Sequence, residues 1–145
     1  MTASPIRVMV ADDNPDIAEM LAYVIGVESA MECVGCVHSA DRLEEEVRAL
    51  RPDVLVLDAK MPGKDPLAAV RDLGPEFPEV RAIFYSGLDD PDFIEQVVDA
   101  GAWGFVSKRR EADVVLAAIR LVAAGKVVFP ERLTRSRRAG LPPAQ

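Results

Sequence analysis

The sequence predicts an α/β protein of three layers, in which helices cover both faces of a parallel β-sheet. Three observations support this class. Short runs rich in β-branched residues alternate five times with segments whose apolar residues recur at helical spacing. The central run, from Asp53 to Asp58, lacks polar alternation, as expected of a strand that is covered on both faces. At 145 residues, the chain also has the length of a single domain.

The first two strand–helix units precede residue 51. Apolar runs predict a first strand over residues 6–11 and a second over residues 31–37. The apolar residues between them have the spacing of one helix face, and they are Ile17, Met20, Leu21, Val24 and Ile25. Ser39 is expected to cap a helix that runs from Ala40 to Leu50.

Helix caps and glycines define the last three units. Asp65 followed by Pro66 predicts a short helix that ends near Gly74, and Asp90 before Pro91 predicts the next one. The fourth and fifth strands are expected over residues 80–85 and 103–106. A final helix, which ends at Gly125, has an apolar face made of Val114, Val115, Ala118, Ile119 and Val122.

Composition and charge restrict the classes of function. No apolar run reaches the ~18–20 residues of a membrane span, and the start of the chain lacks the pattern of a signal peptide, so we expect a cytoplasmic protein without membrane contact. All 24 acidic residues precede four tail arginines, Arg132, Arg135, Arg137 and Arg138. Because an acidic body repels phosphates, we expect no direct binding to nucleic acid.

The two cysteines and the single histidine exclude a disulfide scaffold and most zinc sites. Cys33 and Cys36 are three residues apart in a predicted strand, so we expect them on opposite faces and beyond disulfide reach. A redox or metal function for this pair is therefore not expected.

Polar residues stand where the predicted strands stop, and these are Asp12, Asp13, Asp58, Ser86 and Lys108. Ligands of parallel sheets bind at the carboxyl ends of the strands, so these side chains should lie close together. Three neighbouring carboxylates repel one another and need a cation, and oxygen ligands suit Mg²⁺. Lys108 can pair with a phosphoryl group, Ser86 can donate a hydrogen bond to it, and Asp58 can act as a nucleophile.

The order of these residues, with Met61-Pro62-Gly63 after Asp58 and Gly87 after Ser86, resembles the receiver domain of two-component response regulators over residues 5–125. The resemblance implies a flavodoxin-like (βα)5 fold with the sheet order 2-1-3-4-5. It implies that Asp58 is the phosphoacceptor for a sensor histidine kinase, with Ser86 and Lys108 as catalytic partners. It further implies Mg²⁺ held by Asp12, Asp13, Asp58 and the backbone carbonyl of Lys60, and a switch formed by Ser86 and Phe105.

The resemblance also divides the chain into a receiver domain, residues 1–125, and a linker or flexible tail, residues 126–145. The segment from Ala124 to Pro130 is similar to the end of the receiver in NarL/FixJ-type regulators, where a linker leads to a helix-turn-helix domain. A transcription regulator is the implied output, and the chain itself is expected not to be an enzyme. The family implies homodimers through the face of helix four, strand five and helix five, or through helices one and five.

Two other functions stay open at this point. A solitary or degenerate receiver would act only as a protein-interaction module. A phosphatase similar to haloacid dehalogenases would also form an aspartyl phosphate, but that family has a second aspartate two residues after the first, where this chain has Asn14. Reaction with acetyl phosphate and Mg²⁺ separates the three functions. One stoichiometric phosphorylation supports a receiver, no uptake supports an interaction module, and turnover supports a phosphatase.

Overall fold

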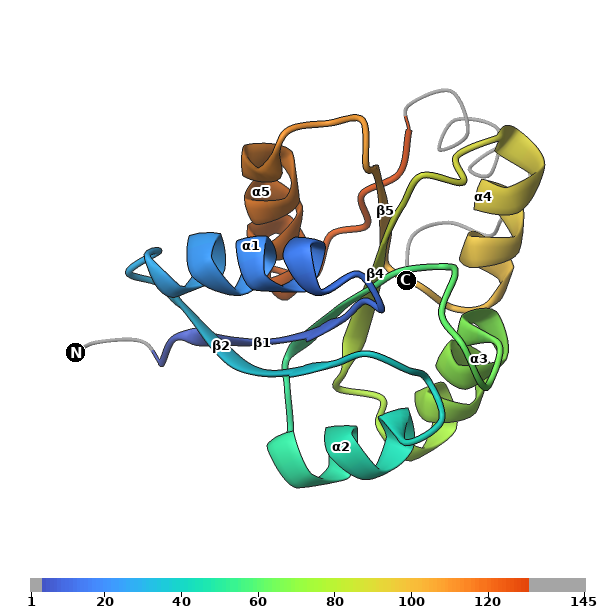
Figure 1. Ribbon diagram of the computed structural model, residues 1–145, viewed down its shortest axis with the longest axis horizontal. Coiled ribbons are helices and arrows are strands. Elements are labelled where there is room, and N and C mark those ends of the chain that lie inside the picture. Colours follow the sequence, from blue (N-terminus) through green and yellow to red (C-terminus); the bar gives the residue numbers. More distant parts are fainter. Residues whose placement is uncertain (1–3, 131–145) are drawn as a thin grey trace.

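A computed structural model describes residues 4–130 as one α/β domain (Figure 1). Its strands are β1 (Ile6–Ala11), β2 (Met31–Val37), β3 (Val54–Leu57), β4 (Arg81–Ser86) and β5 (Gly104–Ser107). Its helices are α1 (Pro15–Gly26), α2 (Leu43–Leu50), α3 (Pro66–Glu76), α4 (Pro91–Asp99) and α5 (Ala112–Ala123). All strand pairs are parallel, and the sheet order is β2-β1-β3-β4-β5, which confirms the predicted fold.

The helices form two layers around the sheet. Helices α1 and α5 cover one face, and α2, α3 and α4 cover the other (Figure 1). In β3, Val54 and Val56 belong to the core on the α1 side, whereas Leu55 and Leu57 belong to the core on the other side. All four side chains are at most 1% exposed. The missing polar alternation in this strand therefore follows from burial on both faces.

Side-chain caps begin three of the helices. Asp65 accepts a hydrogen bond from the backbone N–H of Leu67, and Asp90 accepts one from Phe93, so these two predicted caps are confirmed. Asn14 caps α1 in the same way. Asparagine and aspartate suit these positions because their side chains reach the unpaired N–H groups of the first turn.

The predicted cap at Ser39 is wrong. Helix α2 begins only at Leu43, and its N-terminal residue makes no side-chain cap hydrogen bond. Ser39 instead donates its hydroxyl to the carbonyl of Pro62 at 3.2 Å and accepts from the N–H of Asp41 at 3.1 Å. A tertiary partner in the β3–α3 loop thus replaces the local one, and residues 39–42 form a loop.

The prediction that the two cysteines lie on opposite faces is also wrong, because β2 contains a bulge. Val8 pairs with Cys33 and Val10 pairs with Cys36. One residue separates the two valines in β1, whereas two residues separate the two cysteines in β2. The extra residue restores the alternation, so both cysteines point to the same face. Both are free thiols. Burial, and then the neighbouring Cys33, raises the pKa of Cys36 to about 11.

The bulky Trp103, which lies just before β5, stacks on the side chain of Arg81. The guanidinium carbon is 4.4 Å from the ring centroid, and the same guanidinium donates to the carbonyls of Val122 and Ala123 at the end of α5. Trp103 is half-buried by this contact, in line with a packing role.

After α5, Val128 forms a parallel bridge with Gly104 at the free edge of β5. The predicted linker or flexible tail from residue 131 onward, with its four arginines, falls outside the described residues. Within residues 4–130, all peptide bonds are trans, and no helix has the length and apolar character needed to span a membrane.

Candidate functional site

The loops after β1 and β3 bring three carboxylates together. Ala11 pairs with Leu57, so Asp12 and Asp58 follow neighbouring strands at the same level of the sheet. The Asp58 N–H donates to the carbonyl of Ala11 at 2.9 Å, which fixes the two loops side by side. Asp12 is 1% exposed and Asp58 7%, whereas Asp13 is exposed. One oxygen of each lies within 4.8 Å of the others.

Lys108 reaches this cluster from the end of β5, two strands away from β3. Its Nζ lies 2.8 Å from Asp12 Oδ2 and 3.3 Å from Asp58 Oδ2. The backbone N–H of Lys108 donates to the carbonyl of Ser86, which anchors the base of the side chain. The ammonium also lies 5.8 Å from the ring centroid of Tyr85, so its stem crosses the end of β4. The lysine is therefore the cation that faces two buried carboxylates.

The environment of Asp58 raises the pKa of its carboxyl above the usual value. Burial is the main cause, and the charge of Asp12 adds to it. The charge of Lys108, with hydrogen bonds from Lys108 and from the backbone of Lys60, lowers the pKa but does not offset burial and repulsion. The ionised form of Asp58 is thus disfavoured, and a further positive group beside it would stabilise that form.

The pKa of Lys108 is raised. Burial alone would lower it, but the hydrogen bond to Asp12 and the charges of Asp58 and Asp12 outweigh that effect. Lys108 and Asp58 therefore both shift upward. The two directions are consistent, because the Lys108 ammonium is stabilised by two carboxylates, whereas the Asp58 carboxylate must share one ammonium with Asp12.

Ser86 and Phe105 occupy different levels of the β4–β5 pair. Ser86 ends β4, is 1% exposed, and its hydroxyl oxygen accepts from the N–H of Leu88 at 3.0 Å. Phe105 pairs with Phe84, two residues before Ser86, and is 4% exposed within the core that α4 covers. Ser86 stands at the carboxyl end of β4, the end of the sheet at which Asp58 follows β3, whereas Phe105 lies two levels lower, in the core.

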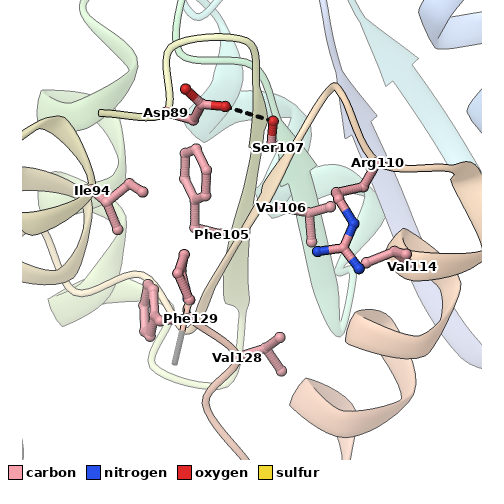
Figure 2. A pocket seen from close by; sticks show the side chains of 10 residues that line it. Asp89, Ile94, Phe105, Val106, Ser107, Arg110, Val114, Val128 and Phe129 are labelled. Carbon is pink, nitrogen blue, oxygen red and sulfur yellow. Dashed lines mark hydrogen bonds between the residues drawn. The ribbon is translucent and has the colours of Figure 1, made fainter. Parts of the chain in front are cut away.

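A group that the sequence analysis missed connects the loops after β4 and β5. Asp89 accepts from the hydroxyl of Ser107 at 2.8 Å (Figure 2) and from Arg109 at 2.9 and 3.1 Å. The hydrogen bonds from Ser107 and Arg109 lower the pKa of Asp89. The sequence analysis assigned the adjacent Asp90 as the N-cap of α4, and nothing in the sequence gave Asp89 a separate role.

His38, the single histidine, was also missed as a neighbour of the site. Its Nδ1 lies 2.9 Å from the carbonyl oxygen of Asp12. It follows β2, the strand that pairs with β1. The imidazole therefore fixes the backbone of the loop that carries Asp12 and Asp13.

The donor set fits a hard divalent cation. Three carboxylates supply oxygen only, and one lysine cannot neutralise all of them. Oxygen ligands with room for water are what Mg²⁺ selects, and the exposed Asp13 leaves one side of the cluster open to solvent.

Residues 8–120 match the family described as the response regulator receiver domain. The transcriptional regulatory protein DegU of Brevibacillus brevis is 28% identical over 131 residues, which are 90% of this chain and 56% of DegU. The response regulator GacA of Pseudomonas viridiflava is 31% identical over 121 residues, 83% of this chain and 56% of GacA. The chain thus spans a little over half the length of these relatives.

Solved structures have the same fold. The signal receiver domain of the putative response regulator NarL from Mycobacterium tuberculosis has a TM-score of 0.81 and 27% identity, and it covers 86% of this chain and 100% of its own. A two-component response regulator of the LuxR family from Aurantimonas has a TM-score of 0.84 at 23% identity, with 94% and 99% coverage.

Proposed function

Because the chain belongs to the response regulator receiver domain family, we propose that Asp58 accepts a phosphoryl group from a phosphohistidine of a sensor kinase. The observation that carries this proposal is the cluster in which Lys108 contacts both Asp12 and Asp58 at 2.8 and 3.3 Å. Such a set of charges suits an incoming phosphoryl group, whose oxygens need positive partners. The chain acts as a stoichiometric acceptor in this proposal and not as an enzyme.

In the transfer, a carboxylate oxygen of Asp58 attacks phosphorus. The P–N bond to the kinase histidine breaks, its electron pair stays on the imidazole nitrogen, and a P–O bond forms an acyl phosphate. The raised pKa of Asp58 favours this chemistry, because a poorly solvated carboxylate is more basic than an ordinary one. The charge of Lys108 and hydrogen bonds from Lys108 and the backbone of Lys60 act against the rise in the pKa of Asp58 and favour its ionised form.

Lys108 and Ser86 then hold the phosphoryl oxygens. Lys108 already contacts Asp58, so a small movement of its flexible side chain can exchange Asp12 for a phosphoryl oxygen. The Ser86 hydroxyl now accepts from Leu88 and keeps its own proton for donation. Movement of Ser86 towards Asp58 would alter the packing beside Phe105, which is the switch that the family implies.

The cation for this site is Mg²⁺, held by Asp12, Asp13, Asp58 and the backbone carbonyl of Lys60. When bound, it neutralises the charge that develops on the transferring group. Asp12 and Asp58 provide buried ligands in fixed positions, since their loops are tied to adjacent strands. Asp12 Oδ1 also accepts from the N–H of Asn14, which orients the carboxylate.

The names of the relatives support the wider role of the domain. DegU is a transcriptional regulatory protein, so we propose that phosphorylation of this domain controls transcription through a longer protein. In the cytoplasm, the partners would be a sensor histidine kinase and a second copy, which docks through α4, β5 and α5 or through α1 and α5. DNA contact would belong to another domain, because this one is acidic.

Incubation with acetyl phosphate and Mg²⁺, followed by intact-mass measurement, tests the acceptor. We expect one phosphoryl group per chain, and none on Asp58→Asn. Asp53→Asn, at the opposite end of β3, is the matched control and should be phosphorylated normally. Uptake by Asp58→Asn at the normal rate would refute the acceptor, continuous release of phosphate would support a phosphatase, and no uptake at all would support an inert interaction module.

A further inference from the structure

The chain that leaves α5 returns to the sheet and adds a short strand to the edge of β5. Gly125, with φ +92°, reverses the chain after the helix. The N–H of Val128 then donates to the carbonyl of Trp103 at 2.9 Å, and its carbonyl accepts from the N–H of Phe105 at 2.8 Å. These two bonds enclose Gly104, its parallel partner. Residues 127–130 are called the edge segment below.

Gly104 is the residue that permits this contact. A Cβ at this position would lie 3.1 Å from the carbonyl oxygen of Val128 and 3.5 Å from its Cβ. The nearest of these contacts is to the backbone of the edge segment, and the Ile83 side chain, at 3.4 Å, closes the other side, so a larger residue here would crowd the segment against β5. The absence of a side chain at Gly104, the first residue of β5, thus leaves room for the edge segment.

The edge segment packs against both layers of the protein. Val128 contacts the core on the α1 and α5 side, and Phe129 contacts the core on the α4 side, which also holds Phe105. Figure 2 shows the Phe105 ring between Asp89 and Phe129, with Ile94 beside it. These side chains line a pocket of about 250 Å³. The pocket gives the Phe105 and Phe129 rings space to move.

The strand that holds the edge segment also carries the phosphoryl-binding lysine. β5 is only four residues long, and Lys108 follows it directly. Phe105, whose N–H holds Val128, is three residues before Lys108. The carboxyl end of β5, next to Lys108, is tied to the β4–α4 loop through Ser107 and Asp89. A displacement of Lys108 or Ser86 therefore acts on a short strand whose other side binds the edge segment.

We propose that the edge of β5 is a strand-binding site whose resident occupant is the edge segment, and that phosphorylation of Asp58 releases this occupant. The inference rests on the function proposed above for Asp58 and Lys108. The acyl phosphate draws Ser86 towards it, the end of β5 moves with Ser86 because the Lys108 N–H is bonded to the Ser86 carbonyl, and Phe105 can no longer hold both its core position and its bond to Val128. Because coupling is reciprocal, the bound edge segment must in turn oppose loading of Asp58.

Two variants measure the reciprocal coupling. Gly104→Ala crowds the edge segment from the β5 side, whereas Phe129→Ala removes the side chain that anchors the segment in the core. If one variant folds poorly, the other still gives the test. Both should bind beryllofluoride with Mg²⁺, a phosphoryl mimic, at least roughly fivefold more tightly than the wild type, within the usual range of allosteric coupling. Val127→Ala, which changes an exposed side chain of the same segment, should bind like the wild type.

Amide hydrogen exchange of the full chain tests the release directly. With saturating beryllofluoride and Mg²⁺, exchange of the Val128 and Phe105 amides should accelerate at least roughly tenfold, while a shift of the Ala59 amide reports that the mimic is bound. If Ala59 shifts but Val128 stays protected, or if all variants bind equally, the release is refuted and the acceptor function stands. If the mimic does not bind, the acceptor function fails and the release fails with it.

Discussion

Replacing Asp58 by asparagine should stabilise the protein in the absence of divalent cations. The amide keeps the shape of the side chain and removes the charge that burial and Asp12 disfavour. With an effective dielectric constant of about 20, two carboxylates within 4.8 Å of each other repel by at least about 3.5 kcal/mol. The attraction between Asp58 and Lys108 at 3.3 Å is about 5 kcal/mol on the same scale.

The balance of these quantities gives the size of the effect. Asp12 repels Asp58 by at least about 3.5 kcal/mol, which offsets most of the attraction to Lys108. The repulsion from Asp12 and the attraction to Lys108 therefore nearly cancel, so the cost of burying the Asp58 charge decides the sign of the effect. We expect Asp58→Asn to raise the free energy of unfolding by about 1–2 kcal/mol, which corresponds to roughly 3–6 °C in Tm.

The gain should depend on pH in one direction. The folded-state pKa of Asp58 lies above its unfolded value, so ionisation of this carboxyl destabilises the fold at neutral pH. As the pH falls through the raised pKa, the wild type takes up the proton and the advantage of the asparagine disappears. Saturating Mg²⁺ should reverse the order, because at about 100 times its Kd a ligand stabilises the wild type by about 2.7 kcal/mol.

Thermal unfolding followed by circular dichroism at pH 7, in EDTA and in Mg²⁺, measures this prediction. Asp113→Asn, which removes an exposed charge on α5, is the matched control and should stay within about 0.5 kcal/mol of the wild type. An Asp58→Asn variant that melts below the wild type in EDTA would show that Lys108 outweighs burial and repulsion, and the reasoning would be wrong.

Three further outcomes are expected. Millimolar Mg²⁺ should raise the Tm of the wild type but much less that of Asp13→Ala; equal shifts would refute the proposed ligand. Alkylation of the Cys36 thiol, whose pKa is raised to about 11, should accelerate about tenfold per pH unit from pH 7 to 10, and a plateau near pH 9 would contradict this. Gly63→Ala should destabilise the fold by at least about 2 kcal/mol in urea unfolding, because φ is +87° and the new Cβ would lie 2.2 Å from Asp41 Oδ1, whereas Gly87→Ala, with open space, should cost under about 1 kcal/mol.

The fold and the gathering of charges could be predicted because both follow from strand order and burial. An unbroken apolar β3 requires two covering layers, and parallel strands must end at one edge, which brings Asp12 and Asp58 together. The same pattern gave no sign of the bulge in β2, since one inserted residue changes the face of a side chain without changing the composition of the strand.

Tertiary partners explain what the sequence could not reveal. Serine is a common helix cap, but Ser39 donates its hydroxyl hydrogen bond to the carbonyl of Pro62, which is distant in sequence. Asp89 binds Arg109 across twenty residues, and His38 contacts the backbone of Asp12 across twenty-six. The segment after α5 has no period of its own, because its position depends on Gly104 in another strand.

The bulge in β2 also affects how the protein behaves beside other copies of itself. β2 and β5 are the two margins of the sheet, and an open margin of regular backbone is a template for pairing between molecules. The extra residue in β2 interrupts the repeat of donors and acceptors and increases the local twist, so a neighbouring chain cannot continue the ladder along the strand. The irregular strand therefore disfavours edge-to-edge aggregation through β2.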